Sequence, residues 1–166
     1  MKNSLGASLG ICAFVVTYLA LGVLSGFTVI WGIFGAWGTY YTNGKGTDNL
    51  QKTITSTIYG AVLSGVAVVL HGYLDVAGSF AWPIAVGLTV YAMTVLVGNK
   101  HFANVPGVVF GYTMAIGLML TAGTADTHSV TALTISNPVI LMSISFVFGA
   151  IAGLVSEKFA GTLSKI

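Results

Sequence analysis

The sequence predicts an all-α integral membrane protein, built as one transmembrane domain over residues 1–166. Two observations lead to this fold class. The chain is 55% hydrophobic and only 6% charged, with a mean hydropathy of +0.93, whereas soluble domains carry about 25% charged residues. Its apolar residues are also gathered into long runs of the length that a bilayer requires. The polar surface is too small to cover a globule in water, so we expect the solvent to be lipid.

Six transmembrane helices are predicted from the apolar runs, which cover residues 4–22, 27–41, 53–74, 80–98, 104–122 and 136–156. Five of the runs have the ~20 residues needed to cross a bilayer. The second has about 15 residues, which at ~1.5 Å per residue cover roughly 22 Å. This segment is therefore either a short crossing or a half-helix that enters the membrane without crossing it.

Prolines and asparagines support the helix boundaries. Pro83, Pro106 and Pro138 each fall in the first turn of a predicted helix, where the missing N–H costs little. Asn104 and Asn137 stand where they can cap the last two helices.

The lysines predict the orientation. Six crossings place every lysine on one side of the membrane, and the positive-inside rule makes that side cytoplasmic, together with both termini. Asp75 and Asp126 then lie outside. Without a crossing at 27–41 the lysines would be split between the two sides, so the rule also favours that crossing. The lysines are Lys2, Lys45, Lys52, Lys100, Lys158 and Lys165.

The two halves, 1–76 and 77–166, resemble each other faintly. GIFGAWG in the first half corresponds to PGVVFGY in the second, and TITS to LTIS, provided that the second half contains an insertion. Three crossings per half would make such repeats inverted, an arrangement typical of transporters. A possible inverted 3+3 repeat is therefore expected.

Glycines four residues apart recur along the chain. Such pairs let helix backbones approach closely in lipid, and both packing within the chain and contact between copies are open interpretations. The pairs are Gly6/Gly10, Gly22/Gly26, Gly107/Gly111 and Gly149/Gly153.

Several kinds of chemistry are excluded by the motifs. The Gly44-Lys45-Gly46 tail of the second run lacks the spacing and the preceding strand of a phosphate loop. The histidines stand apart from one another and Cys12 is the only cysteine, so no metal site is expected. No nucleophile stands with a base. The sequence thus predicts no enzyme, cofactor or metal, and its sparse lysines without arginine predict no nucleic-acid partner.

No Asp, Glu, Lys, Arg or His lies well inside the predicted spans, which offer hydroxyl, aromatic and glycine residues among their aliphatic side chains. Proton-coupled carriers and pumps depend on intramembrane ionisable groups, so passive transport is favoured. A narrow uncharged path suits a small neutral polar solute. The candidate pore or substrate-binding residues are Trp31, Phe34, Gly35, Trp37, Thr39, Tyr40, Pro106, Gly107, Phe110, Tyr112 and Thr113.

One helical turn separates His71 from Asp75 at the end of the third run. This pair is the candidate gate, because histidine titrates near physiological pH; an interfacial anchor is the alternative. We therefore expect a channel or facilitator for a neutral solute of urea or amide size, assembled as a homo-oligomer. The alternative function is a scaffold or subunit that transports nothing and binds partner membrane proteins through glycine-rich helix faces.

WGIFGAWGTYYTNGKG, TSTIYGAVLSGVAVV and NVPGVVFG resemble segments of the YcdZ-like family of small bacterial inner-membrane proteins, a domain family of unknown function. The resemblance runs over about residues 10–156. It implies a multi-pass protein of the bacterial inner membrane and supplies neither a substrate nor site residues.

Overall fold

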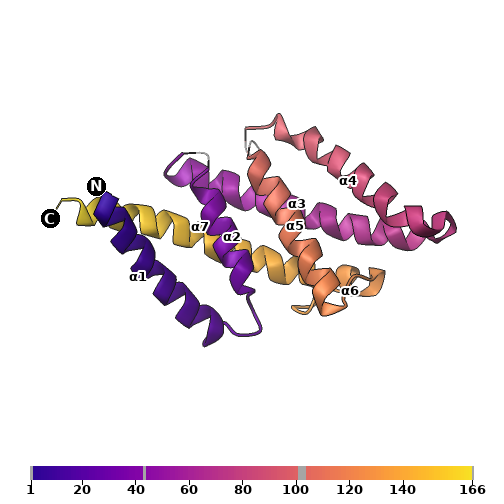
Figure 1. The fold of residues 1–166 in the computed structure, drawn as a ribbon, viewed down its shortest axis with the longest axis horizontal. Coiled ribbons are helices and arrows are strands. Elements are labelled where there is room, and N and C mark those ends of the chain that lie inside the picture. Colours follow the sequence, from indigo (N-terminus) through magenta and orange to yellow (C-terminus); the bar gives the residue numbers. More distant parts are fainter. Residues whose placement is uncertain (1, 43, 101–103, 166) are drawn as a thin grey trace.

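The computed structural model describes residues 2–42, 44–100 and 104–165, apart from the side chains of Lys2, Asp75 and Val97. The chain is almost entirely helical (Figure 1). Its elements are α1 (Lys2–Leu21), α2 (Ile30–Tyr40), α3 (Thr47–Tyr73), the 3₁₀ helix η1 (Asp75–Phe80), α4 (Ala81–Val97), α5 (Val105–Ala122), α6 (Thr127–Thr131) and α7 (Pro138–Leu163).

Five segments of the described chain are long and apolar enough to cross a membrane, as expected of a multi-pass membrane protein. They lie in α1, α3, α5 and α7 and in the run Val76–Leu96, which joins η1 to α4. The expected second crossing is shorter than the apolar run that predicted it. Helix α2 has 11 residues, which cover only about 16 Å at ~1.5 Å per residue. The connection from α1 contains turns and an isolated bridge between Ser25 and Thr28, so the helix begins only at Ile30.

The predicted helix caps are confirmed for α5 and α7. The side chain of Asn104 accepts a hydrogen bond from the Gly107 N–H at 2.9 Å, and that of Asn137 accepts one from the Val139 N–H at 2.8 Å. Both helices have proline in the first turn. Each side-chain oxygen satisfies an amide that the first helical turn leaves without an intrahelical partner.

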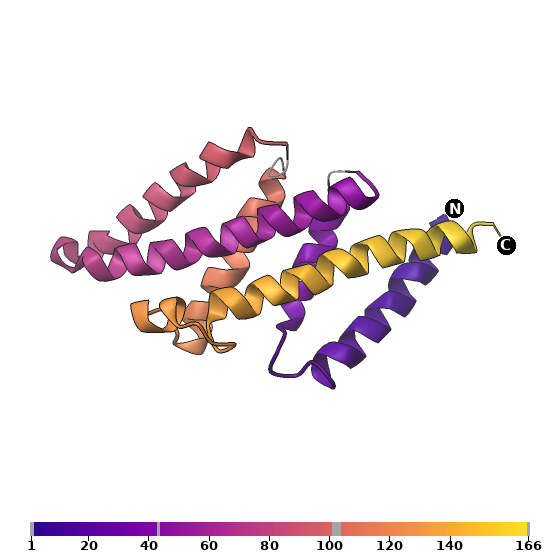
Figure 2. The ribbon, with the colours of Figure 1, turned by 180° about the vertical axis from the view of Figure 1, so that it is seen from behind.

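The helices pack in matched pairs. The long helices α3 and α7 contact each other and form the centre of the molecule, as the views from both sides show (Figures 1 and 2). Helix α5 packs along α3 in the way that α2 packs along α7, and α4 flanks α3 as α1 flanks α7. The shorter helices α2 and α5 also contact each other.

Glycines allow the two closest helix contacts. A Cβ on Gly60 of α3 would clash with the Val108 carbonyl of α5, and a Cβ on Gly149 of α7 would clash with the Ile33 carbonyl of α2. Backbone therefore lies directly on backbone in both pairs. The pairs Gly107/Gly111 and Gly149/Gly153 serve packing within the chain, whereas a Cβ added to Gly6 or Gly10 of α1 would have nothing within 4 Å.

The centre of the molecule is filled by apolar side chains. Ala61 and Val68 of α3 pack with Met119 of α5 and with Met142 and Phe146 of α7, and all five are buried. A solute path along this centre is closed in the arrangement seen here, because these side chains occupy the space between the long helices.

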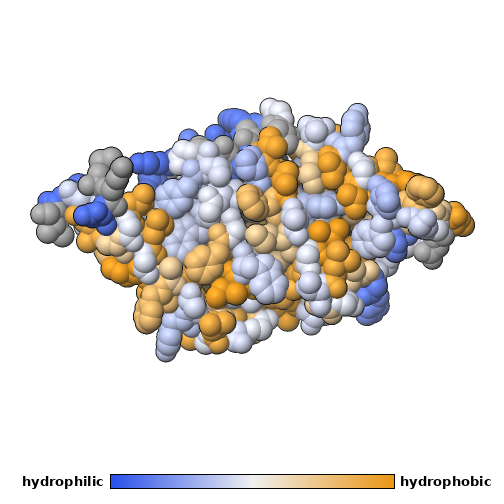
Figure 3. Space-filling model, viewed as in Figure 1, coloured by the Kyte–Doolittle hydropathy of each residue, from blue (hydrophilic) through white to orange (hydrophobic). Residues whose placement is uncertain are grey.

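The lysines gather at one end of the helices. Thr42, in the α2–α3 turn, contacts the Asn104 side chain at the start of α5, and Glu157 near the end of α7 contacts the Gly46 N–H. We call this end the lysine face and the opposite end, with α6, the far face. In Figure 3 the most hydrophilic residues lie mainly toward the upper left, near the termini, over a middle band of apolar and weakly polar residues. The described lysine side chains at the lysine face are Lys45, Lys52, Lys100, Lys158 and Lys165.

Candidate functional site

Helices α2 and α5 bring together part of the predicted site. Thr39 and Tyr40 of α2 and Gly107 of α5 are buried, and a Cβ on Gly107 would lie 3.1 Å from the Thr39 methyl group. Gly35 packs against Met114, whose Cε would lie 2.9 Å from a Cβ there. The two segments therefore meet, as expected, and they pack tightly at Gly35 and Gly107.

Other predicted site residues face outward. Trp31, Phe34 and Phe110 are 48%, 39% and 44% exposed, and Pro106 and Thr113 are also on the surface. The Thr113 hydroxyl donates to the Val109 carbonyl of its own helix. Phe34 lines a surface hollow together with Leu9 and Ala13 of α1. Pro106, Phe110 and Thr113 line a separate surface hollow along α5.

Trp37 and Tyr112 are buried in separate places. The Trp37 indole N–H donates to Ser156 Oγ at 3.0 Å, and the Tyr112 hydroxyl bonds that of Thr89 on α4 at 3.0 Å. Both aromatic residues therefore connect helices through hydrogen bonds rather than line a pore.

The histidine of the candidate gate packs against a neighbouring helix. The His71 ring stacks on that of Trp82 at the start of α4, with ring centroids 4.2 Å apart. This contact fits the alternative role of an anchor between α3 and α4. The side chain of Asp75 lies outside the described part of the chain.

An uncharged polar cluster lies where α2, α3 and α5 meet near the lysine face. It consists of Asn49, Thr53, Ser56 and Asn104, all at most 2% exposed. The first three follow a spacing of four and three residues along α3 and so share one helix face. We call these four residues the junction cluster.

Each member of the junction cluster has a buried polar atom without a partner. The atoms are Asn49 Oδ1, Thr53 Oγ1, Ser56 Oγ and Asn104 Nδ2. A buried polar atom left unpaired costs about 1–3 kcal/mol, and native proteins contain few of them. Four such atoms at one helix junction therefore mark a place that favours water or a small polar molecule.

Gly107 is at the centre of this junction. A Cβ there would lie 3.0 Å from both Asn104 Cγ and Ser56 Cβ, so these two side chains are no more than twice that distance apart. An added methyl group would fit only if these side chains moved by a few tenths of an ångström. A molecule larger than water can enter only if α5 and α3 separate.

A second polar network joins α2 to α7 beside the junction cluster. The Tyr40 hydroxyl donates to the Glu157 carboxylate, which also accepts from the Gly46 N–H at 3.0 Å. Ser156 Oγ bonds both the Trp37 indole and the Tyr41 hydroxyl. Every polar group named here is paired, so this network has a structural role.

The far face has a matching contact that is complete. The Val29 N–H donates to Ser145 Oγ at 2.7 Å, and the same hydroxyl donates to the Leu141 carbonyl at 2.9 Å. Ser145 thus satisfies the amide just before α2, whereas Ser56 has no partner beside α5.

This difference predicts opposite effects on stability for two matched substitutions. Ser145→Ala strands the Val29 N–H and is expected to lower the free energy of unfolding by about 1–3 kcal/mol. Ser56→Ala removes an unpaired hydroxyl and is expected to leave stability unchanged or slightly higher. Thermal unfolding of the two variants in the same detergent measures both effects; equal losses would contradict this description of the junction cluster.

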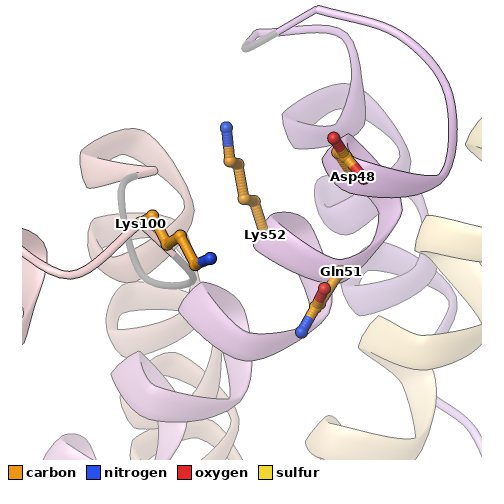
Figure 4. A pocket seen from close by; sticks show the side chains of 4 residues that line it. All are labelled: Asp48, Gln51, Lys52 and Lys100. Carbon is orange, nitrogen blue, oxygen red and sulfur yellow. The ribbon is translucent and has the colours of Figure 1, made fainter.

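A hollow on the lysine face lies beside the junction cluster. It is lined by Asp48, Gln51, Lys52 and Lys100, with Lys52 and Lys100 on facing sides (Figure 4). Asp48 and Lys52 directly precede Asn49 and Thr53, so the first turns of α3 carry the hollow on one side and the cluster on another.

The sequence indicated part of this site. Thr39, Tyr40 and Gly107 were expected there, but Asn49, Thr53 and Ser56 lie before or at the edge of the apolar run and Asn104 was considered only as a cap. The spacing of Asn49, Thr53 and Ser56, which places them on one face of α3, is the signal that could have identified these three residues. Among the described residues, no three His, Cys, Asp or Glu side chains come together as a metal-binding group.

The chain matches the model of one known protein family. The model of the family described as "Protein of unknown function (DUF1097)" matches residues 7–161. The chain belongs to the DUF1097 family. This match agrees with the expected domain family of unknown function, while the likeness to YcdZ itself stays a resemblance. No curated protein and no solved structure matches this family member significantly.

Proposed function

We propose that the protein is a passive facilitator that carries a small neutral polar solute, of urea or short-amide size, across the bacterial inner membrane. The observation that carries the proposal is the junction cluster, with four buried polar atoms that lack partners. Amide and hydroxyl groups supply both donors and acceptors without charge. They suit a solute that is itself neutral and offers both.

The packed centre favours a carrier that changes conformation over a permanently open pore. Met119, Met142 and Phe146 fill the space between the long helices, and Gly107 packs closely against the cluster. Separating α5 from α3 hydrates the unpaired atoms, and this gain offsets part of the lost packing. The hollow beside Lys52 and Lys100 is the route from the lysine face, which we assign to the cytoplasm together with both termini.

The matched packing of the helices supports an inverted repeat of α1–α3 with α4, α5 and α7. The correspondence differs from the one expected from TITS and LTIS, because Thr53–Ser56 lie inside α3 and residues 133–136 precede α7. Ser56-Thr57-Ile58-Tyr59-Gly60-Ala61 instead corresponds to Ser145-Phe146-Val147-Phe148-Gly149-Ala150. The extra residues that include α6 are then the insertion in the second half.

Solute-driven swelling of vesicles that contain the purified protein tests this function. We expect faster swelling with urea or short amides than in empty vesicles, and a roughly 2–10-fold lower rate for Ser56→Ala combined with Thr53→Val, as lost neutral hydrogen bonds predict. The matched control is Thr113→Val, which removes an outward hydroxyl bonded to its own helix. Swelling no faster than in empty vesicles for any of these solutes would refute the proposal.

A scaffold is the second candidate function. Gly6 and Gly10 of α1 are exposed and unoccupied, and small residues four apart favour helix association in lipid. A stoichiometric partner protein that copurifies with the chain and is lost on Gly6→Leu, without solute flux, would favour this function. The same purification in mild detergent reports whether the chain forms the homo-oligomer that we also propose.

A further inference from the structure

The contact of Ser145 on the far face has the same geometry as the contact of Ser56 near the lysine face. A Cβ on Gly107 would lie 3.0 Å from Ser56 Cβ, and a Cβ on Gly32 would lie 3.1 Å from Ser145 Cβ. In both cases a glycine in the first turns of a short helix lies directly against a serine of a long helix.

The next turn of each long helix repeats the match. Gly60 lies four residues after Ser56 and lies against the Val108 carbonyl, one residue after Gly107. Gly149 lies four residues after Ser145 and lies against the Ile33 carbonyl, one residue after Gly32. Two successive contacts therefore correspond in residue type, spacing and the atoms that meet.

The two places differ in hydrogen bonding and in the other side chains beside the glycine, which are Asn104 and Thr39 at Gly107 and Met142 at Gly32. Ser145 Oγ accepts from the N–H of Val29, the residue before α2. The corresponding residue before α5 is Asn104, and Ser56 Oγ has no partner. The far-face contact is thus sealed by a hydrogen bond, and the contact near the lysine face lacks this bond.

We propose that these two contacts are equivalent half-sites of the carrier, and that they open in alternation on opposite sides of the membrane. In the arrangement seen here the far half-site is sealed and the near half-site is poised to open. In the alternate arrangement Ser56 accepts from the Asn104 N–H and seals the near half-site, while Val29 separates from Ser145. The inference rests on the proposed function and adds a second binding half-site, formed by Val29, Gly32 and Ser145.

The alternation follows from the shared centre. Helices α2 and α5 contact each other, and so do α3 and α7, so a shift of one short helix along its long partner moves the other pair. Each half-site presents an uncharged serine hydroxyl beside a glycine in the first turn of the partner helix. In transporters built from inverted repeats, alternating access is largely the rocking or gating of one repeat against the other.

Two equivalent disulfide locks test the proposal. The near lock is Gly107→Cys with Ser56→Cys, and the far lock is Gly32→Cys with Ser145→Cys, both in a Cys12→Ala background. The Cβ separations, 3.0 and 3.1 Å, are slightly below the roughly 3.5–4.5 Å of disulfides, so each pair must move slightly apart. The far lock also requires the flexible Met142 side chain to move, because its Sδ would clash with a Cβ on Gly32. A third cysteine reports accessibility from each side of the membrane. It is labelled with a membrane-impermeant maleimide in vesicles that contain the protein in one known orientation.

The reporters are placed in the opposite half. Met142→Cys, next to Gly32 on the far side, reports on the near lock, and Thr53→Cys reports on the far lock. We expect closing the near lock to raise labelling of Met142→Cys from the far side by about fivefold or more, the usual size of a coupling between sites. With the far lock closed, we expect Thr53→Cys to be labelled from the lysine face alone. Reducing the disulfide of either lock is expected to restore the labelling seen without that lock.

Two outcomes with the near lock closed would overturn the alternation. One is that labelling of Met142→Cys from the far side stays low, and the other is that Met142→Cys is labelled from the lysine face. Labelling needs no solute, so its outcome is separate from that of vesicle swelling. Swelling with no change in labelling leaves a facilitator without alternating half-sites. Alternating labelling without swelling would support the two half-sites and refute transport of the solutes tested.

Discussion

Replacing Gly60 by alanine is expected to destabilise the protein by about 3 kcal/mol, the upper end of the cost of overpacking. The new methyl group would clash with the Val108 carbonyl and come within 2.6 Å of the Tyr112 N. Both are backbone atoms of α5, which a rotamer change cannot move. The helices α3 and α5 must therefore separate along their length, and the variant should elute as aggregated protein or unfold at a much lower temperature.

Gly117→Ala is the matched control for this result. Gly117 is also in a helix of the same pair, yet nothing lies within 4 Å of a Cβ built there. Alanine favours helix over glycine by about 0.5–1 kcal/mol, so this variant should be as stable as the parent or slightly more so. Thermal unfolding in detergent compares the two, and a Gly60→Ala variant as stable as Gly117→Ala would contradict the close approach of α3 and α5.

Tyr40→Ala is expected to cost about 3–5 kcal/mol, the range for truncating a buried aromatic side chain. Tyr40 is completely buried, and its ring lies against Gly153, 2.5 Å from a Cβ built there. The truncation empties this space between α2 and α7. It also strips the Glu157 carboxylate of the hydroxyl that bonds it, which leaves a partly buried charge with one partner fewer.

Tyr40→Phe separates the two contributions. It keeps the ring and removes the hydroxyl, so we expect a smaller loss of about 1.5–3 kcal/mol, typical of hydrogen bonds to charged groups. Tyr91→Ala is the control, because Tyr91 is 75% exposed on α4 and its loss leaves no cavity. Apparent unfolding temperatures in one detergent should rank Tyr91→Ala above Tyr40→Phe and Tyr40→Phe above Tyr40→Ala; equal values for the two Tyr40 variants would show that the ring contributes little.

Much of the architecture was predictable because lipid imposes strong rules on sequence. Apolar runs located the helices to within a few residues, except where α3 and α7 continue into polar sequence at Thr47 and Leu163. Backbone hydrogen bonds continue a helix past the end of its apolar part, so hydropathy misses such extensions. The asparagine caps were predictable because the side chain and the amide that it accepts from are neighbours in sequence.

The site was only partly predictable because it depends on which helix faces meet. Trp31, Phe34, Gly35 and Trp37 belong to one glycine-rich segment, yet Phe34 is exposed and Trp37 is buried against α7. A period of 3.6 residues turns neighbours to different sides of a helix, and in lipid both sides are apolar. Hydropathy therefore cannot tell a packed face from a lipid-facing one.

The sequence by itself determined that this chain is a bundle of membrane-type helices, where most of these begin and end, and that the middle of its apolar runs carries no charged side chain. Those features follow from local rules, namely apolar length, proline position and capping. Only the tertiary structure decided which glycines bring helices together and that Asn49, Thr53, Ser56 and Asn104 are buried at one junction without partners. Whether a buried polar atom has a hydrogen-bond partner depends on which group of another helix lies beside it. That group is distant in the sequence.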